Sequence, residues 1–463
     1  MRVEGILSLF ACLSLVTAAR PATTSPATSS PTTSSPATSS PATTSSPSVT
    51  ESPTSVTTSG TGTSSPTSAP ATNTSATGVV PTTSAATATL PTGSLSPTVL
   101  PTPTLVPAPL GGVGLNETPV FQPLSDYDVQ SIQLDLHQSL LELNLLQFGL
   151  TQFNTSDFTQ ANLTEEDVFL LQYMVEQDAA HVQLVQGILS PNITQPCNYT
   201  FPVFADVRGF LDFAQKITRI GESGTAGWIN HLDSQASASY ILSALLVEAR
   251  QQMALRQMEG LFPMPYYFVP SITQSMHWSL IAPFIATCPP ENPTVNWTVF
   301  PPLTILNDPF WPDLPLDNTS GPSISANRSS VSFPGRELNL SWVAPGQPIG
   351  SNSSFNTTSN ASTPQFVAWI SEVNITYTSL NNVTGTNGTA IQPEALVFSN
   401  LSAPLTNLSA PVGNLSLPLN LSAPLFNETV FIALTDAAIY VTPYNLSQLE
   451  PHIFAGPAIY QAG

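Results

Sequence analysis

Three polar side chains lie where the hydrophobic pattern predicts the inward faces of two helices. Glu142 lies within a leucine-rich run, and Asp178 and His181 lie between two apolar stretches of a later segment. Residues at positions i and i+3 share a helix face, so Asp178 and His181 are expected to point toward one axis. A carboxylate on one helix and an Asp-x-x-His on the next make up half of a four-helix carboxylate metal site.

Candidates for the other half come from two later segments. Glu248 is flanked by Leu and Val and is followed three residues later by Gln251, while Glu222 lies in the segment before it. Carboxylate oxygens suit iron or manganese, and imidazole is a neutral ligand that leaves positions open for dioxygen or peroxide. Bridging carboxylates can hold two cations close together. The candidate cofactor is therefore iron or manganese, and the candidate metal ligands are Glu142, Asp178, His181, Glu222 and Glu248.

A purely structural interpretation of the same residues stays open. His181 could be a hydrogen-bonded core residue, and Glu142 and Glu248 could form buried ion pairs, which need good geometry to be stable. The arginines that could supply such pairs are Arg219, Arg250 and Arg256. Convergence of the five candidate ligands on one axis would favour the metal site, whereas an arginine pointing into that space would favour a bundle held by ion pairs.

These side chains require a bundle of helices, and the sequence marks several helix ends. Ser125 is a suitable N-cap, Thr164 with Asp167 forms a capping-box pattern, and Gly260 followed by prolines ends the last long helix. The segment between the first two helices is expected to be a polar loop. We assign the bundle to residues 111–290, with helices at 126–149, 164–187, 207–229 and 236–259 and a shorter one at 272–285.

The N-terminal part of the chain indicates secretion. Residues 1–19 contain one arginine, an apolar run and then small residues, the pattern of a cleaved signal peptide. Residues 20–110 are almost entirely Ser, Thr, Pro, Ala and Gly. They have too little apolar surface to offset the entropy of ordering, so we expect a disordered, mucin-like, O-glycosylated stalk. The mature protein is expected to be extracellular or associated with a cell wall.

Charge and motifs narrow the possible partners. The net charge is −20, which argues against nucleic acid and anionic membranes as partners. No later apolar run is long enough for a membrane span. Serine-hydrolase, zinc-protease, phosphate-loop and dinucleotide-binding motifs are absent from the sequence. The expected partners are therefore extracellular or cell-wall glycans or proteins.

Cysteines and sequons agree with an oxidising compartment. Cys12 is removed with the signal peptide, so Cys197 and Cys288 are expected to form one disulfide that closes a loop of about 90 residues. Asn-x-Ser/Thr sequons are frequent, and each is a candidate surface glycosylation site in a secreted protein. The candidate glycosylation sites are Asn116, Asn154, Asn162, Asn192, Asn198, Asn296, Asn339, Asn374 and Asn445.

The C-terminal part has a different periodicity. Within residues 291–463, apolar and polar residues alternate in several runs rich in β-branched and aromatic residues, which predicts half-buried strands. An Asn-Leu-Ser-x-Pro repeat at 400–427 is expected to be a glycosylated loop, because recurrent proline is excluded from central strands. The fold class is therefore an α+β multidomain protein with a stalk, a helical bundle and a β-rich, sandwich-like domain.

Several longer stretches resemble a known family. The runs LLELNLLQFGL, FTQANLTEEDVFLLQYMVEQDAAHV, FLDFAQKITRIGESG and LLVEARQQMALRQMEGLFPMP are similar to the secreted ferritin-like domain family of fungi. That family includes stress-response and late-sexual-development proteins and is distantly similar to plant desiccation-related proteins. The resemblance covers roughly residues 120–290 and implies a ferritin-like four-helix bundle.

The chain departs from the ligand pattern of ferritin-like sites at three positions. Gln251 stands where a second Glu-x-x-His would place its histidine, Asp178 is one methylene shorter than Glu, and Thr218 falls near the expected helix-3 carboxylate. The sequence therefore predicts a secreted, glycosylated surface or wall protein with a role in stress or developmental response, whose bundle is a scaffold with a degraded metal site. The alternative is a metal-binding, oxidase-like or peroxide-handling bundle with iron or manganese.

Overall fold

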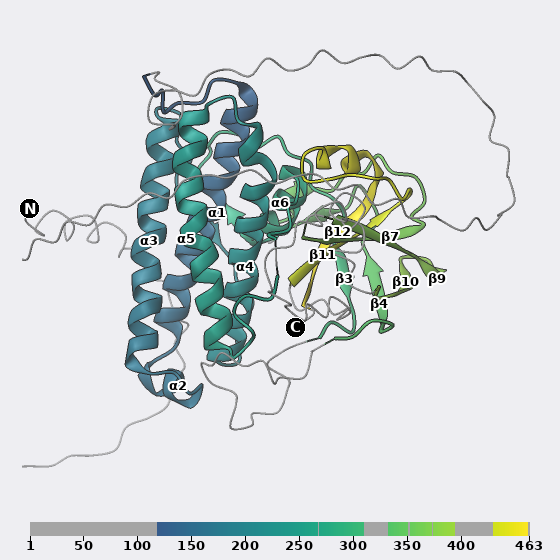
Figure 1. Cartoon of the computed structure of the whole chain (residues 1–463), viewed down its shortest axis with the longest axis horizontal. Coiled ribbons are helices and arrows are strands. Elements are labelled where there is room, and N and C mark those ends of the chain that lie inside the picture. The colour runs from purple at the N-terminus through teal and green to yellow at the C-terminus, as the bar shows by residue number, and fades with distance from the viewer. Residues whose placement is uncertain are drawn as a thin grey trace, which may run out of the picture. The chain divides into compact units, whose positions relative to one another are not determined.

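The computed structural model describes residues 118–309, 332–393 and 429–461, apart from 267, 351 and 373, and leaves the side chain of Asn374 undescribed. The predicted signal peptide, the stalk, Asn116 and the loop at 400–427 lie outside these residues. The described part contains helices followed by antiparallel sheets, so the predicted α+β class is confirmed (Figure 1).

Four long helices form the bundle, in which the first two pack extensively against each other and the last two likewise (Figure 1). These helices are α1 (Asp126–Gln152), α3 (Glu165–Leu189), α4 (Val207–Trp228) and α5 (Gln235–Met258). Shorter elements connect and flank them, namely α2 (Thr155–Gln160), η3 (Ile229–His231), α6 (Gln274–Ile281) and η4 (Ala282–Phe284). No helix among the described residues is long and apolar enough to cross a membrane.

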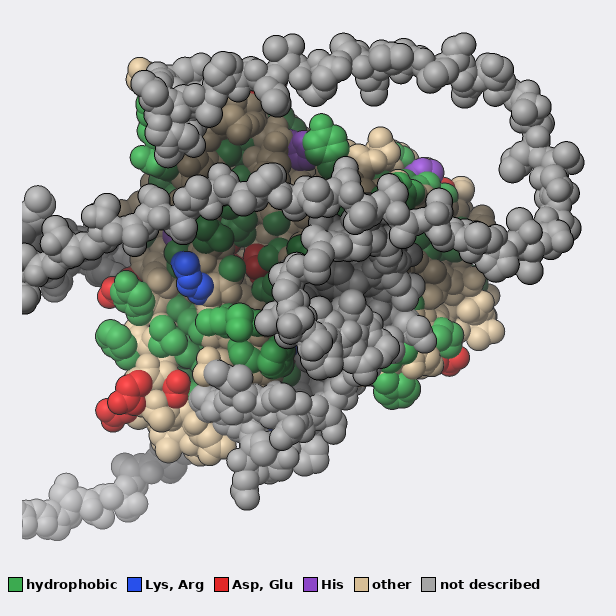
Figure 2. All heavy atoms as spheres, in the orientation of Figure 1, with side chains coloured by type: hydrophobic (Ala, Val, Ile, Leu, Met, Phe, Trp, Pro, Cys, Tyr) green, Lys and Arg blue, Asp and Glu red, His purple; other side chains and the backbone are tan. Residues whose placement is uncertain are grey.

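Capping side chains set the helix starts. Ser125 accepts a hydrogen bond from the backbone N–H of Asp128, and Thr164 forms a complete capping box with Asp167. α3 also begins with acidic residues, which suit the positive end of its dipole, and acidic side chains gather at the α2 end of the bundle (Figure 2). The predicted starts of α1 and α3 agree with the structure to within one residue.

The prediction of a polar loop between the first two long helices was wrong in one respect. This segment contains α2, which is only six residues long. Asn154 caps it through a capping box with Asp157, and Phe158 is buried against the end of the bundle. A single buried aromatic residue in a polar stretch gives too weak a periodicity to predict a helix of this length.

Two glycines of α4 allow other segments to approach closely. A Cβ atom at Gly224 would lie 2.0 Å from Nδ1 of His277 on α6. A Cβ atom at Gly227 would lie 2.0 Å from the backbone oxygen of Ile272, in the loop before α6. The closely spaced glycines of α4 therefore permit tight packing of α6 and its preceding loop.

The C-terminal part contains two four-stranded antiparallel sheets, of which the order in the first is β3-β4-β10-β9 and in the second β12-β11-β7-β8. Their strands are β3 (Leu303–Ile305), β4 (Glu337–Trp342), β7 (Phe366–Ser371), β8 (Asn374–Ser379), β9 (Asn381–Thr384), β10 (Asn387–Ile391), β11 (Thr429–Thr435) and β12 (Ile453–Gln461). Short pairs join β1 (Asn198–Tyr199) to β2 (Ile285–Thr287) and β5 (Pro348–Ile349) to β6 (Phe355–Asn356). One more 3-10 helix, η6 (Leu446–His452), precedes β12.

Strand β11 connects two hydrophobic cores. Val430, Ile432 and Leu434 pack into a core that the two sheets share, whereas Phe431 and Ala433 pack into the core that contains the helices. Side chains alternate between the faces of a strand, so a strand buried on both faces becomes apolar throughout. The second sheet is therefore enclosed by the first sheet on one face and by the helical part on the other.

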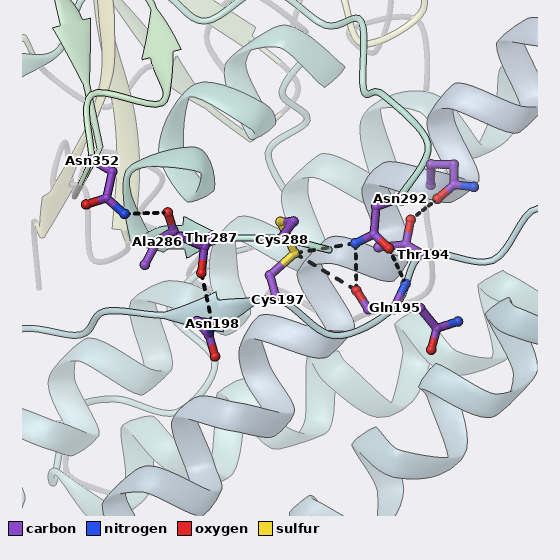
Figure 3. The surroundings of a disulfide bond; sticks show 10 residues. Thr194, Gln195, Cys197, Asn198, Ala286, Thr287, Cys288, Asn292 and Asn352 are labelled. Carbon is purple, nitrogen blue, oxygen red and sulfur yellow. Dashed lines mark hydrogen bonds between the residues drawn. A yellow bond between two sulfur atoms is a disulfide. The ribbon is translucent and has the colours of Figure 1, made fainter. Parts of the chain in front are cut away.

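The disulfide between Cys197 and Cys288 is present, as predicted (Figure 3). It lies beside the β1–β2 pair, where the Asn198 amide donates to Oγ1 of Thr287 over 2.8 Å. The Asn292 side chain makes two hydrogen bonds of 2.8 Å with the backbone of Gln195 on the other side of the bridge. The bridge thus ties the connection between α3 and α4 to the segment that follows α6.

Candidate functional site

Three of the five candidate ligands lie close together between α3 and α5. Nδ1 of His181 lies 3.7 Å from Oε1 of Glu248 and 4.0 Å from Oδ1 of Asp178. Burial lowers the pKa of His181 to about 4, so its imidazole is neutral near pH 7. These contacts are therefore not strong ion pairs.

Gln251 takes part in the same cluster. Its Nε2 donates a 2.9 Å hydrogen bond to Oδ1 of Asp178 and a longer one, 3.2 Å, to Oε1 of Gln177. Glu248 and Gln251 are three residues apart on α5, and Asp178 and His181 are three residues apart on α3, so the two pairs face each other. The amide of Gln251 therefore bonds a carboxylate at the position where a second imidazole was expected.

Glu142 enters from α1 and is 4% exposed. Burial raises the pKa of Glu142 well above its ordinary value, and the nearby Glu248 and Asp178 raise it further. Its Oε1 and the Oδ2 of Asp178 are buried without a hydrogen-bond partner among the described residues. The structure thus brings four of the candidate ligands into one buried group.

The group of carboxylates extends to Asp135, which sequence reasoning missed. Burial raises the pKa of Asp135 to about 7, against a hydrogen bond that it accepts from Thr225 over 3.0 Å. Burial also raises the pKa of Glu248, to which Asp135 is the next largest contributor. Asp135 lies between two leucines and seven residues before Glu142, so a two-turn spacing on α1 was the available signal.

Glu222 differs from the other candidates because it has its own cation. Its Oε2 accepts a 2.7 Å hydrogen bond from Nη1 of Arg219, and both side chains are at most 1% exposed. The Arg219 guanidinium also lies 4.0 Å above the ring of Tyr266, whose hydroxyl donates to Oε1 of Glu222 over 3.3 Å. The structural alternative of an inward-pointing arginine therefore holds for Glu222, with Arg219 as the partner.

The arginines proposed as partners for Glu142 and Glu248 have other positions. Arg219 bonds Glu222, Nε of Arg256 donates to the backbone oxygen of Phe262, and Arg250 is exposed. The carboxylates of the central group instead lie next to one another and to neutral side chains. Burial raises the pKa values of these carboxylates, which favours their protonated, uncharged forms in the absence of a nearby positive charge among the described residues.

The residues of this site differ from those of a dinuclear metal centre. Such a centre in a four-helix bundle uses a Glu from each of two helices and a Glu-x-x-His from each of the other two. Here Gln251 replaces one histidine, and Glu222 is paired with Arg219. Within the described ranges, no three or more His, Cys, Asp or Glu side chains are arranged to hold a metal ion. The chain does not supply the dinuclear set, and a metal ligand role for the five residues stays a prediction.

Most of the candidate glycosylation sites in the described part are accessible. Asn445 is half-buried, whereas the other asparagines whose side chains are described are exposed. Those exposed sites are Asn154, Asn162, Asn192, Asn198, Asn296 and Asn339. Glycosylation at these positions stays a prediction that their accessibility permits.

Comparison with known proteins gives two matches. A model of the ferritin-like domain matches residues 126–261, which span α1 to the end of α5. The protein rds1 of Schizosaccharomyces pombe (strain 972) is 38% identical over 367 residues, which cover 77% of this chain and 86% of that protein. The match to rds1 is longer than the helical part of the chain. This chain therefore belongs to the ferritin-like domain family that includes rds1.

Proposed function

We propose that this chain is a secreted, glycosylated surface or wall-associated protein that acts in stress or developmental response, with the bundle as a scaffold whose metal site is degraded. The hydrogen bond from Gln251 to Asp178 is the observation that carries the scaffold part of this proposal. An amide and the carboxylate to which it donates form a stable buried pair. As a metal ligand, however, an amide is a weak substitute for imidazole.

The ion pair of Arg219 with Glu222 supports the same proposal. A metal ion in a carboxylate bundle neutralises the buried negative charges, and here a fixed guanidinium neutralises one of them. Burial raises the pKa values of the other carboxylates of the site, and neighbouring carboxylates raise those of Glu142 and Glu248 further, so that protons can neutralise them. The bundle can therefore remain folded without a metal ion.

A second candidate function is a metal-binding, oxidase-like or peroxide-handling bundle with iron or manganese. The observation that favours it is the position of His181, within 4.0 Å of carboxylate oxygens on both Asp178 and Glu248. Neutral imidazole and carboxylates are donors that these metals accept. A metal held there would supply redox chemistry, and the residues of this chain would hold it and exclude water.

Elemental analysis of the purified protein separates the two functions. The protein is stripped with a chelator, reloaded with Fe(II) or Mn(II), desalted and analysed for bound metal. We expect no stoichiometric metal in the wild type, and no difference between Glu142→Ala and the control Glu176→Ala, which changes an exposed carboxylate of α3. About two metals per chain that are lost in Glu142→Ala but kept in Glu176→Ala would refute the scaffold.

Location and partners follow from the predicted signal peptide, the stalk and the exposed sequons. We propose extracellular or cell-wall glycans or proteins as partners, without a role for nucleic acid or a membrane span. The net charge of −20 is the main argument against nucleic acid. Detection of the protein with an antibody in separate medium, wall and cell-extract fractions tests the location. A change in electrophoretic mobility after removal of N-glycans tests whether the sequons are glycosylated. A full-length, unglycosylated protein found inside the cell would refute this part of the proposal.

A further inference from the structure

A cavity of about 280 Å³ lies apart from the carboxylate group, where helix ends meet the C-terminal segment. All of its lining residues belong to the described part of the chain. Its walls come from the start of α1, the end of α4 with η3 and the loop after it, the start of α6, the segment before β3 and the region around η6. The lining includes Tyr127, Asp233, Gln274, Trp297, Tyr444 and Glu450.

Three aromatic residues, Tyr127, Trp297 and Tyr444, line the cavity together with His231. Tyr127 and Trp297 meet edge to face with ring centroids 6.2 Å apart. Tyr444 is 83% exposed at the mouth of the cavity and lies 5.6 Å from the ring of His231. The faces of aromatic rings carry partial negative charge, and several rings around one space form a favourable site for a cation.

Two carboxylates add full negative charges to these partial ones. Asp233 and Glu450 line the cavity, and neither forms an ion pair with a described residue. No Lys or Arg is found among the lining residues, all of which are described. Glu450 acts on Tyr127 across this space, since it contributes to the raised pKa of the Tyr127 hydroxyl, whose main cause is burial. The field inside the cavity therefore attracts cations.

Hydrogen bonds fix the positions of the lining residues. Gln274 is 7% exposed, and its Nε2 donates to the hydroxyl of Tyr127 over 2.7 Å and to Oγ of Ser131 over 3.2 Å. Oδ1 of Asp128 accepts a 2.8 Å hydrogen bond from the backbone N–H of Asp233, which fixes the loop that carries this carboxylate. The cavity is thus formed by the fold and does not need a ligand to assemble it.

We propose that this cavity binds a small organic cation, a quaternary or protonated amine. Its volume is just below the usual range for ligand pockets, which suits a compact ligand. The aromatic faces would contact the charged nitrogen and its carbon substituents, and Asp233 and Glu450 would supply the counter-charge. An anionic ligand would meet two carboxylates without a lysine or arginine in the lining to offset them, and a neutral polyol would leave both carboxylates uncompensated.

Calorimetric titration of the full secreted protein tests the proposal. The probes are tetramethylammonium, choline and the neutral isostere of choline in which carbon replaces nitrogen, together with the dimer of glucosamine and its N-acetylated form. Choline represents a free amine, and the glucosamine dimer represents an amine carried on a polysaccharide. Two variants, Asp233→Asn and Glu450→Gln, remove the carboxylate charges. Tyr444→Ala removes an aromatic ring of the lining, and its control is Tyr440→Ala, because Tyr440 is equally exposed but does not line the cavity.

We expect saturable binding of at least one cationic probe, weakened at least about tenfold by loss of the charge in the isostere or by acetylation. The carboxylate pair of variants should weaken it by a similar factor, and Tyr444→Ala by at least about threefold, while Tyr440→Ala has no effect. Binding of the glucosamine dimer alone would support the proposal and identify a polysaccharide as the source of the amine. Equal binding of charged and neutral probes, equal effects of the two tyrosine variants, or no saturable binding of any amine would overturn it.

Discussion

Replacement of Asp178 by Asn tests whether the folded protein is more stable when the buried carboxylate of Asp178 is protonated. Asp178 is 1% exposed, and burial raises its pKa from 3.8 to about 7. Because the folded pKa is the higher one, the folded protein keeps this proton at pH values where the unfolded chain releases it. The stability from protonated Asp178 is therefore fully present below pH 3.8 and is lost as the pH rises through 7. Asn carries no charge and does not have this loss.

The size of the stability difference between Asp178→Asn and the wild type follows from the raised pKa of Asp178. Because the pKa of Asp178 rises from 3.8 to about 7, and a tenfold change in an equilibrium constant corresponds to about 1.4 kcal/mol, the free energy of unfolding lost above pH 7 approaches about 4 kcal/mol. Gln251 can still donate to the amide oxygen of an Asn at this position. We expect Asp178→Asn to be more stable than the wild type by up to about 4 kcal/mol at pH 8, with a melting temperature about 8 °C higher. At pH 4 the two proteins should differ little.

Urea and thermal unfolding at pH 4, 6 and 8, with a chelator present and absent, measure this difference. Glu176→Gln is the matched control, because it neutralises an exposed carboxylate on the same helix and should change stability by less than about 0.5 kcal/mol. A less stable Asp178→Asn at pH 8 would refute the reasoning, since it would mean that the charged carboxylate has a favourable partner. If that loss occurred only without chelator, the partner would be a metal ion.

Three further changes test the packing around this group. In urea unfolding, Arg219→Met should lower the free energy of unfolding by about 3–5 kcal/mol, because it leaves the buried carboxylate of Glu222 without its cation. Adding Glu222→Gln to this variant should restore most of the lost stability. In the same assay, Cys197→Ser should lower the free energy of unfolding by about 4–5 kcal/mol, because the disulfide joins residues that are 91 positions apart in the sequence. A wild-type protein that is equally stable under reducing conditions would contradict this prediction. Gly227→Ala should lower the melting temperature markedly, because its Cβ would lie 2.0 Å from a backbone oxygen, whereas Gly187→Ala, with open space at that position, should raise it slightly. Equal effects of the two alanines would show that the loop before α6 can move aside.

Local signals in the sequence predicted a large part of the fold. The N-caps at Ser125 and Thr164 fix the starts of α1 and α3, because each cap satisfies backbone N–H groups within a few residues. The disulfide followed from compartment and from the presence of Cys197 and Cys288 alone. These features depend on neighbouring residues or on residue counts, so no knowledge of the tertiary structure was needed.

Features that depend on contacts between distant segments could not be predicted in this way. The ring of Tyr266 lies over Arg219, although no pattern in the loop after α5 points to α4. The amine cavity unites Tyr127 with Glu450, more than 300 residues later in the chain. Periodicity shows which face of an element is buried, but it does not show which residue of another element that face meets. Such pairings become visible only when the helices and sheets are placed together.

The buried carboxylates explain how a bundle can change its function and keep its fold. Glu142, Asp178 and Glu248 lie close together in the interior, where charged carboxylates are costly without cations. A metal ion, protons or an arginine can each supply positive charge; in this chain Arg219 pairs with Glu222, and the raised pKa values of the other carboxylates favour protons there. Any metal that binds must displace those protons, so its affinity should rise steeply with pH. A site with raised carboxylate pKa values would therefore be least able to hold metal in an acidic extracellular medium, where the protonated bundle is most stable.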